Sequence, residues 1–299
     1  MARIINETEL QSAGFYWRES DDVQALVCSE LEAEGFINGF STRMGGISPM
    51  PDGSLNLAGF HEDAAENILE NRRRFLKLFP GNWTLAGCWQ VHGTDARVVK
   101  SAAEARPAEN ALGETIYCDA IVSNASKVLA GVKTADCVPI LIGDPRTGAF
   151  AAIHAGWRGT LSGIAGYTLK RLSNEYQTQP ADVHVAIGPA AAVCCYEVGK
   201  EVIDAFREQF PENASSLLEP TKDGHARIDL LKANRVQLTV AGVSSERIYT
   251  APFCTMCNTD LFFSYRREKR LHGKVGRLMS VVGRKQELAR KSKKGLLDS

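Results

Sequence analysis

The chain has 299 residues, of which 44% are hydrophobic and 23% charged, and its 35 basic residues balance its 35 acidic ones. Such a composition can bury a sizeable core, and a net charge of zero argues against a general nucleic-acid or membrane surface. No apolar run approaches the ~18 residues of a membrane span, and the N-terminus lacks the apolar core of a secretion signal. We therefore expect a cytoplasmic protein whose eight cysteines are mostly reduced thiols.

In chain order, the first predicted elements are a strand over 36–42 and a helix over 62–78. Two long loops separate them, and loops of that length are often functional. The helix carries Glu early and Arg and Lys late, which suits its dipole. Further along, strands are predicted near 96–99, 116–123 and 127–133, and the stretch 101–113 is predicted to be a loop.

The second half alternates strands and helices. Apolar residues at helical spacing predict a helix that starts at an N-cap, Thr160, and runs to about Leu172. Because a strand, a glycine-rich loop and a helix then recur, the pattern hints at an internal duplication of strand–loop–helix units. The remaining predicted elements are a strand over 183–187, a helix ending near 210, a helix over 230–241 capped by Asp229, and strands near 247–251 and 277–283. The basic stretch 284–299 is predicted to be a flexible tail.

One predicted β-hairpin carries a thiol on one arm and an imidazole on the other. Its turn is the loop Asp144-Pro145-Arg146-Thr147-Gly148. Antiparallel pairing that is symmetric about Pro145 and Arg146 places Cys137 opposite His154, with Cβ atoms about 4.5–5.5 Å apart. At that distance the two side chains can share one metal ion or one proton.

His92 adds a third group to this pair. Like His154, it lies beside a glycine at the predicted end of a strand. Two histidines and a cysteine with water in the fourth position make a plausible catalytic zinc site. The same ligands also bind copper, but a multicopper oxidase needs a histidine-rich trinuclear cluster, and the other four histidines are scattered. The alternative to a metal site is two hydrogen-bonded histidines and a buried thiol.

A metal-free cysteine hydrolase fits the hairpin equally well. In it Cys137 is the nucleophile and His154 its base, oriented by a third group such as Gln90 or Asp136. The pair Cys254 and Cys257 has the spacing of a zinc knuckle, but no second pair stands in register with it, so we favour packing for these thiols.

A glycine-flanked arginine, Arg158, stands where a strand ends and a helix begins. Backbone N–H groups at a helix start attract anions, and a guanidinium adds a planar fork of donors. Trp157 and Tyr196 can stack on a ligand or belong to the core.

Several sequence blocks together resemble the signature of the YfiH family, also called the laccase-domain or polyphenol oxidase family. The blocks occur in the family's order between about 36 and 283. They are Ser41-Thr42-Arg43-Met44-Gly45-Gly46, Gln90-Val91-His92-Gly93, Ala135-Asp136-Cys137-Val138-Pro139, His154-Ala155-Gly156-Trp157-Arg158-Gly159, Cys195-Tyr196-Glu197-Val198 and Phe263-Ser264-Tyr265-Arg266-Arg267.

The resemblance implies an α+β fold, layered α/β/β/α with mixed β-sheets, in a single catalytic domain over 1–283. It implies a zinc ion, with copper less favoured, held by the catalytic residues His92, Cys137 and His154. It also implies phosphorolysis of adenosine, inosine, guanosine and methylthioadenosine to the base and ribose 1-phosphate, with adenosine deamination as a second activity.

The partners that follow are a purine nucleoside and phosphate, with no nucleic acid and no membrane, and a monomer or weak homo-oligomer. The family associates the arginine matching Arg43 with the substrate pocket, and Arg158 and Arg266 are further candidate anchors for phosphate or ribose. Two alternatives stay open: the cysteine hydrolase, and a non-catalytic purine-binding or cell-wall quality-control protein.

Overall fold

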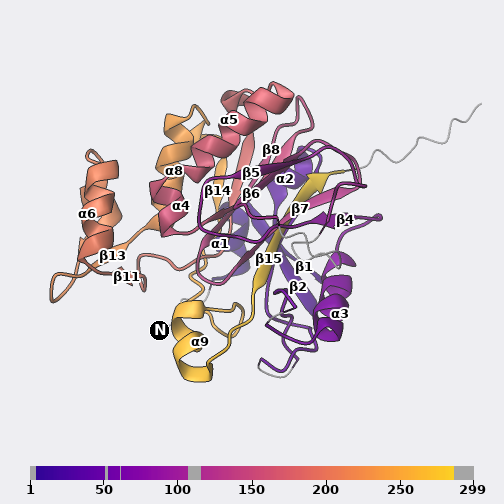
Figure 1. Ribbon diagram of the computed structural model, residues 1–299, viewed down its shortest axis with the longest axis horizontal. Helices are drawn as coiled ribbons and strands as arrows, with labels where there is room; N and C mark the ends of the chain where they lie inside the picture. The colour runs from indigo at the N-terminus through magenta and orange to yellow at the C-terminus, as the bar shows by residue number, and fades with distance from the viewer. Residues whose placement is uncertain (1–4, 51–52, 61, 107–115, 286–299) are drawn as a thin grey trace, which may run out of the picture.

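Two six-stranded mixed sheets stack face to face in the computed structural model, which describes residues 5–50, 53–60, 62–106 and 116–285 (Figure 1). The first sheet has the order β1 (Phe15–Ser20), β2 (Val23–Cys28), β3 (Phe36–Ser41), β15 (Leu278–Arg284), β7 (Val128–Thr134) and β4 (Thr84–Ala86). The second has the order β14 (Ile248–Thr250), β10 (His184–Ile187), β8 (Val138–Gly143), β9 (Phe150–Ala155), β6 (Ala120–Ser123) and β5 (Ala96–Val99). Both sheets are mixed, because β4–β7 at one edge of the first sheet and both edge pairs of the second sheet, β5–β6 and β10–β14, are parallel, whereas the other pairs are antiparallel.

Helices cover the outer faces of both sheets. On the second sheet, α5 (Ile164–Tyr176) and α8 (Leu230–Val240) pack against the residues of β8 and β9 that point outward, such as Ile140 and Ile153. On the first sheet, α3 (Ala65–Leu76) buries Phe75 against β2, β3 and β15. The expected α/β/β/α layering of an α+β fold is therefore confirmed.

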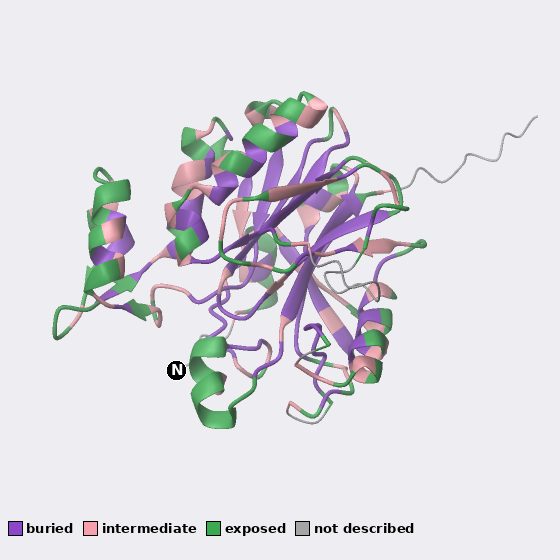
Figure 2. Ribbon diagram, in the orientation of Figure 1, coloured by how far each residue is buried: buried purple, intermediate pink, exposed green. Residues whose placement is uncertain are grey.

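The central core lies between the two sheets, where purple strands fill the middle of Figure 2. Alternate residues of each strand point into it, among them Phe40 of β3, Leu141 of β8 and Phe150 of β9. The alternation of apolar residues thus defines which residues of β8 and β9 point toward the central core. Cys137 and His154 fall on that same alternation, so both belong to the inward side.

A small three-stranded sheet projects from one end of the second sheet (Figure 1). It consists of β11 (Glu197–Val198), β13 (Ala226–Ile228) and β12 (Leu218–Pro220), with α6 (Lys200–Gln209) and α7 (Ala214–Leu217) beside it. These strands have two or three residues, too short for a periodic pattern, and the sequence did not predict them.

The helix after His154 departs from the prediction. It is two helices, α4 (Trp157–Leu161) and α5, separated at Gly163, which has a left-handed φ of 80°. The N-caps are Gly156 and Gly163, so the prediction of Thr160 as N-cap is wrong. The Thr160 hydroxyl instead accepts a hydrogen bond from Asn234 Nδ2 of α8 at 3.0 Å.

The β8–β9 hairpin exists, but its register differs from the predicted one by two residues. His154 pairs with Pro139 rather than Cys137. The last strand pair is Gly143 with Phe150, and the Asp144 N–H donates to the Ala149 carbonyl, so the turn is centred between Arg146 and Thr147 rather than between Pro145 and Arg146. A shift of two residues preserves the face to which each side chain points. Cys137 and His154 therefore become diagonal neighbours on the same side.

Most of the other predicted helices and strands coincide with elements of the structure. Asp229 caps α8 by accepting the Lys232 N–H at 2.8 Å, as expected. Besides the short strands of the third sheet, the elements that the sequence did not predict are α1 (Glu7–Ser12), β1, β2, α2 (Ser29–Ala33), β4, α7 and α9 (Tyr265–His272), and two 3₁₀ turns span Pro180–Asp182 and Ser245–Arg247. Residues 107–113 of the loop predicted over 101–113 and all but the first two residues of the 284–299 tail lie outside the described residues. Within the described part of the chain, no helix has the length and apolar character needed to cross a membrane.

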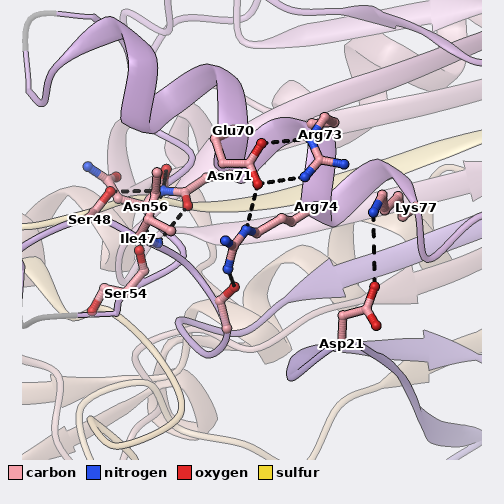
Figure 3. A network of polar contacts seen from close by, with 11 residues as sticks. Asp21, Ile47, Ser48, Ser54, Asn56, Glu70, Asn71, Arg73, Arg74 and Lys77 are labelled. Carbon is pink, nitrogen blue, oxygen red and sulfur yellow. Dashed lines mark hydrogen bonds and ion pairs between the residues drawn. The ribbon is translucent and has the colours of Figure 1, made fainter.

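A buried asparagine on α3 organises the long loop after β3 (Figure 3). Asn71 accepts the Ile47 N–H at 2.9 Å and donates to the Ser48 hydroxyl at 2.8 Å and to the Asn56 carbonyl at 3.0 Å. Asn56 in turn accepts the Arg277 N–H at 2.9 Å. The loop is therefore held between α3 and the segment that leads into β15.

Candidate metal centre

Three side chains from distant parts of the chain converge at one edge of the space between the sheets. The ligand atoms of His92, Cys137 and His154 all lie within 4.8 Å of one another. The Cys137 sulfur is 3.9 Å from His92 Nε2, and the two imidazole rings are edge to face with centroids 4.8 Å apart. His154 is buried, Cys137 half-buried and His92 exposed. The group is thus anchored in the protein and open to solvent on one side.

The local backbone brings the three groups together. His154 is on β9, Cys137 immediately precedes β8, and His92 occupies a turn before β5 with a left-handed φ of 61°. Gly156 leaves the space that they need, because a Cβ at that position would be 2.7 Å from His92 Cδ2 and 3.2 Å from the Cys137 sulfur. This close approach explains the glycine after His154.

A buried aspartate, Asp119, holds two of the three groups in place. Its carboxylate accepts from His154 Nδ1 at 2.8 Å. It also accepts the backbone N–H groups of His92 at 2.9 Å and Gly93 at 2.7 Å. A carboxylate on one ring nitrogen leaves His154 Nε2 facing the site, an arrangement common around metal-ligating histidines.

Sequence reasoning missed Asp119. A signal was present, because the aspartate stands immediately before the apolar strand Ala120–Ser123 and a carboxylate buried there needs donors. The third group suggested for the hydrolase was Gln90 or Asp136, and that prediction is wrong. Gln90 is bonded to the Lys133 backbone, and Asp136 accepts from Thr255, Ser264 and the Arg266 N–H.

The electrostatics of the metal-free site favour a thiolate beside an imidazolium. Burial raises the pKa of the Cys137 thiol, but the charge of His154 and hydrogen bonds from both histidines outweigh it and bring the pKa to about 6. Burial lowers the pKa of His154, but the thiolate and Asp119 raise it to about 9. A metal cation that displaces the proton from His154 would therefore find the Cys137 sulfur already in its anionic form.

A cavity of about 500 Å³ opens directly onto the three side chains. That volume is in the range of sites that hold small molecules. Besides His92, Cys137 and His154, its walls include two cationic residues, Lys133 and Arg277, and two aromatic residues, Trp89 and Tyr265. The Arg277 guanidinium lies 5.6 Å from the Tyr265 ring centroid and pairs with Glu62 at 2.9 Å.

The three arginines singled out in the sequence lie outside this cavity's described lining. Arg43 lines a different cavity, where its buried guanidinium bonds to Glu268 at 2.8 Å and to two carbonyls. Arg158 is exposed, with its guanidinium 4.1 Å from the Trp157 ring centroid. Arg266 is exposed, lies 5.1 Å from the Tyr196 ring centroid and donates to the Glu197 carbonyl.

The fold and the site together define a class: layered α/β/β/α proteins with a His–Cys–His group at the edge of the second sheet. The chain belongs to the family described as multi-copper polyphenol oxidoreductase laccase, whose sequence pattern matches residues 37–285. The resemblance to the YfiH or laccase-domain family is thus confirmed.

Named relatives and solved structures agree with this membership. The chain is 36% identical over 265 residues to purine nucleoside phosphorylase YlmD of Geobacillus stearothermophilus, covering 88% of this chain and 95% of the relative. It is 33% identical over 258 residues to purine nucleoside phosphorylase YlmD of Bacillus subtilis, covering 84% and 89%. The crystal structure of the Geobacillus YlmD superposes with a TM-score of 0.82, covering 91% of this chain and 99% of that one, and YfiH of Bacillus licheniformis, 29% identical, with 0.81 and the same coverage.

Proposed function

We propose that the protein is a zinc-dependent purine nucleoside phosphorylase. In this proposal it converts adenosine, inosine, guanosine or methylthioadenosine, with phosphate, to the base and ribose 1-phosphate, and deaminates adenosine as a second activity. The observation that carries the proposal is the convergence of His92, Cys137 and His154 at the mouth of a cavity large enough for a nucleoside. The names of the relatives, which cover most of the chain, support the same reaction.

The donor set fits zinc. Two imidazoles and a thiolate, with the fourth side open to a cavity, match the ligands of catalytic zinc sites. A copper oxidase would need a cluster of histidines. The described residues bring potential ligands together in two groups of three or more, and the second group contains cysteines alone. When bound, the metal supplies Lewis acidity toward a substrate oxygen or nitrogen.

The chain's own residues supply the rest of the site. Asp119 fixes the tautomer and orientation of His154 and the backbone of His92. Lys133 brings a cation to the cavity wall for phosphate, and Arg277, whose charge is paired with Glu62, adds a second guanidinium-bearing wall residue. Trp89, 36% exposed, and Tyr265, 47% exposed, offer aromatic surface to a purine ring.

The arginines predicted from sequence have different places in the proposal. Arg158 and Arg266 are exposed and remain proposed anchors for phosphate or ribose. The Arg43 guanidinium already has Glu268 and two carbonyls as partners, so its proposed contribution to the substrate pocket is to hold α9 in position. We further propose that residues 1–283 act as one catalytic unit in the cytoplasm, a monomer or weak homo-oligomer; eight free thiols support a reducing compartment.

The variant Cys137→Ala tests the proposal. We expect the wild-type protein to contain zinc and to release ribose 1-phosphate from adenosine or inosine only when phosphate is present. Removing the thiolate should lower zinc content by about one ion per chain and reduce turnover by at least about 100-fold, because one of three ligands is gone.

Cys28→Ala is the matched control, since Cys28 is a free thiol buried in the core away from this site. It should retain both zinc and turnover. Unchanged zinc content and turnover in Cys137→Ala would contradict the assignment, as would turnover of inosine in the absence of phosphate.

A metal-free cysteine hydrolase is the second candidate, and one observation favours it. Cys137, His154 and Asp119 form a chain of nucleophile, base and orienting carboxylate, and the pKa of the thiol is about 6. This alternative predicts activity on amides or esters that survives chelators and is abolished by alkylation of Cys137. The phosphorylase predicts loss of activity with chelator and its recovery with zinc.

A further inference from the structure

A second cluster of four cysteines lies apart from the His–Cys–His group. Cys194 and Cys195 are in the loop between β10 and β11, and Cys254 and Cys257 are in the loop after β14. Their sulfur atoms all lie within 4.8 Å of one another. The sequence favoured packing for Cys254 and Cys257 because no second pair stood nearby in register, and the structure supplies that pair from a distant loop.

The sulfur positions suit a single tetrahedral ion. A zinc ion with four thiolates at about 2.3 Å requires sulfur–sulfur edges of about 3.8 Å. Cys257 is 3.6 Å from the Cys194 sulfur and 3.3 Å from the Cys195 sulfur. All four residues are free thiols. Small movements of the sulfurs would therefore complete the geometry.

Two of the four sulfurs accept hydrogen bonds from donors outside the cluster. The Ala192 N–H donates to the Cys254 sulfur at 3.4 Å, and the Arg267 guanidinium donates to the Cys195 sulfur at 3.8 Å. Backbone donors and a cation around the sulfurs offset the negative charge that four thiolates would carry.

The two loops are already fixed to each other. The Thr255 N–H donates to the Ala190 carbonyl at 3.0 Å, and Ala190 forms an isolated β-bridge with Cys254. The Cys257 N–H closes a turn on the Cys254 carbonyl at 3.2 Å. Backbone hydrogen bonds thus hold the two ligand-bearing loops together, which lowers the entropic cost of binding an ion.

Packing alone does not account for the cluster. Cys254 is buried, but Cys195 and Cys257 are half-buried and Cys194 is exposed. An exposed thiol contributes little to a core. The exposed side also gives an ion a route from solvent.

We propose that Cys194, Cys195, Cys254 and Cys257 bind one structural zinc ion. Four protein ligands leave no open position, which distinguishes this site from a catalytic one. The bound ion would stabilise the loop that contacts the residue before Cys137. Thr255, next to Cys254, donates to the Asp136 carboxylate at 2.7 Å, and Asp136 directly precedes Cys137.

The test uses the full chain in a Cys137→Ala background, so that its result is independent of the proposed function. Reduced, metal-stripped protein is given one equivalent of Zn²⁺ in competition with a chromophoric chelator. We expect about one tightly held zinc ion per chain, and the strong visible absorption of tetrahedral thiolate coordination when Co²⁺ is used instead. Adding Cys257→Ser or Cys194→Ser should weaken zinc binding by at least about 100-fold, whereas adding Cys28→Ala should not.

Circular dichroism and thermal melts of each variant separate lost binding from lost folding; Cys194 is exposed, so its serine variant should fold. Zinc binding should also raise the melting temperature of the Cys137→Ala protein and not that of the Cys194→Ser double variant. The proposal is overturned if reduced Cys137→Ala protein fails to bind Zn²⁺, if the serine variants bind it as tightly, or if the purified cluster holds iron or a disulfide instead.

Discussion

At the scale of single residues, the His–Cys–His group depends on Gly156, a position that has no side chain. The His92 ring and the Cys137 sulfur occupy the space where a Cβ would lie. The backbone there has an ordinary φ of −71°, so alanine meets no backbone strain. What the glycine provides is room for two ligands to approach each other.

The variant Gly156→Ala should therefore damage the metal site without unfolding the protein. The added methyl group would be 2.7 Å from His92 Cδ2, and His92 is exposed and able to move away. We expect metal affinity to fall by about 10–100-fold, as when ligand orientation is lost, and turnover to fall with it. Metal competition titration and a thermal melt of the same sample measure both effects.

Gly166→Ala provides the control for that substitution. Gly166 lies in the interior of α5, and a Cβ there meets no described atom within 4 Å. Alanine in a helix interior should raise stability by about 0.5–1 kcal/mol and leave metal binding unchanged. If both variants bind metal as well as the wild type, the argument from space around His92 is wrong.

Individual residues also show what a sequence can and cannot reveal about this site. The metal candidates were visible as residue types beside glycines at strand ends. For Asp119 the sequence carried only its place before an apolar strand, and its role could not be read from it, because that role depends on a turn and a strand that meet only after folding. The same holds for Cys194 and Cys195, whose partners come from a loop far along the chain.

At the scale of elements, hydrophobic patterning predicted β8, β9, β3 and α3 well, but it did not fix the hairpin register. The register depended on where pairing ends: Ala149 stands opposite Asp144 inside the turn, which moves the centre of the hairpin by one residue. The face of each strand was nevertheless correct, since apolar alternation has a period of two residues. The short strands of the third sheet carry no such pattern, so their existence could not be read from the sequence.

The element that most directly shapes the cavity from outside the site is α3, through Asn71. This buried side chain binds the loop at Ile47, Ser48 and Asn56 (Figure 3). The same stretch continues to Gly59, which lines the cavity, and the Leu57 N–H donates to the Arg277 carbonyl at 2.9 Å. The Asn71 amide therefore contributes both to the stability of the protein and to the position of the cavity wall.

Asn71→Ala should lower both stability and substrate affinity. Removing the amide leaves buried backbone groups without partners, at a cost of about 1–3 kcal/mol, or a fall in Tm of about 2–5 °C. Because Gly59 and Arg277 lose support, KM for the nucleoside should rise more than kcat falls. Thermal melts and steady-state kinetics measure the two effects.

Asn67→Ala, one turn earlier on α3, serves as the comparison. Asn67 donates to Asp63 on the helix surface at 3.1 Å, so its loss should change stability by no more than about 0.5 kcal/mol. Equal destabilisation by the two alanine variants would show that the contacts of Asn71 with the loop contribute no more than the single surface hydrogen bond of Asn67, since alanine itself favours a helix.

At the scale of the whole molecule, a cluster of polar contacts joins the two ends of the described chain. Glu32 of α2 pairs with Arg18 of β1 at 2.7 Å and also accepts a hydrogen bond from the Tyr16 hydroxyl. Lys285, directly after β15, donates to the Glu32 carbonyl at 2.7 Å and lies 3.6 Å from its carboxylate. Since β15 is central in the first sheet, these contacts connect the edge of that sheet to its middle.

The contacts of Glu32 make a contribution to the free energy of unfolding that depends on pH. Burial raises the pKa of Glu32, but hydrogen bonds from Tyr16 and Arg18 outweigh it, and the pKa falls below the usual 4.5. A folded pKa below the unfolded one means that the contribution is fully present above about pH 5 and is lost as the pH falls through the folded value. Glu32→Gln should therefore lower the Tm at pH 7 by about 1–2 °C, equivalent to about 1 kcal/mol, and the difference from wild type should close as the pH falls through the folded pKa of Glu32. The control is Glu212→Gln, in an exposed loop, which should match the wild type at pH 7 and at pH 3. If the Tm difference between Glu32→Gln and the wild type were the same at pH 7 and pH 3, the charge of the Glu32 carboxylate would not stabilise these contacts.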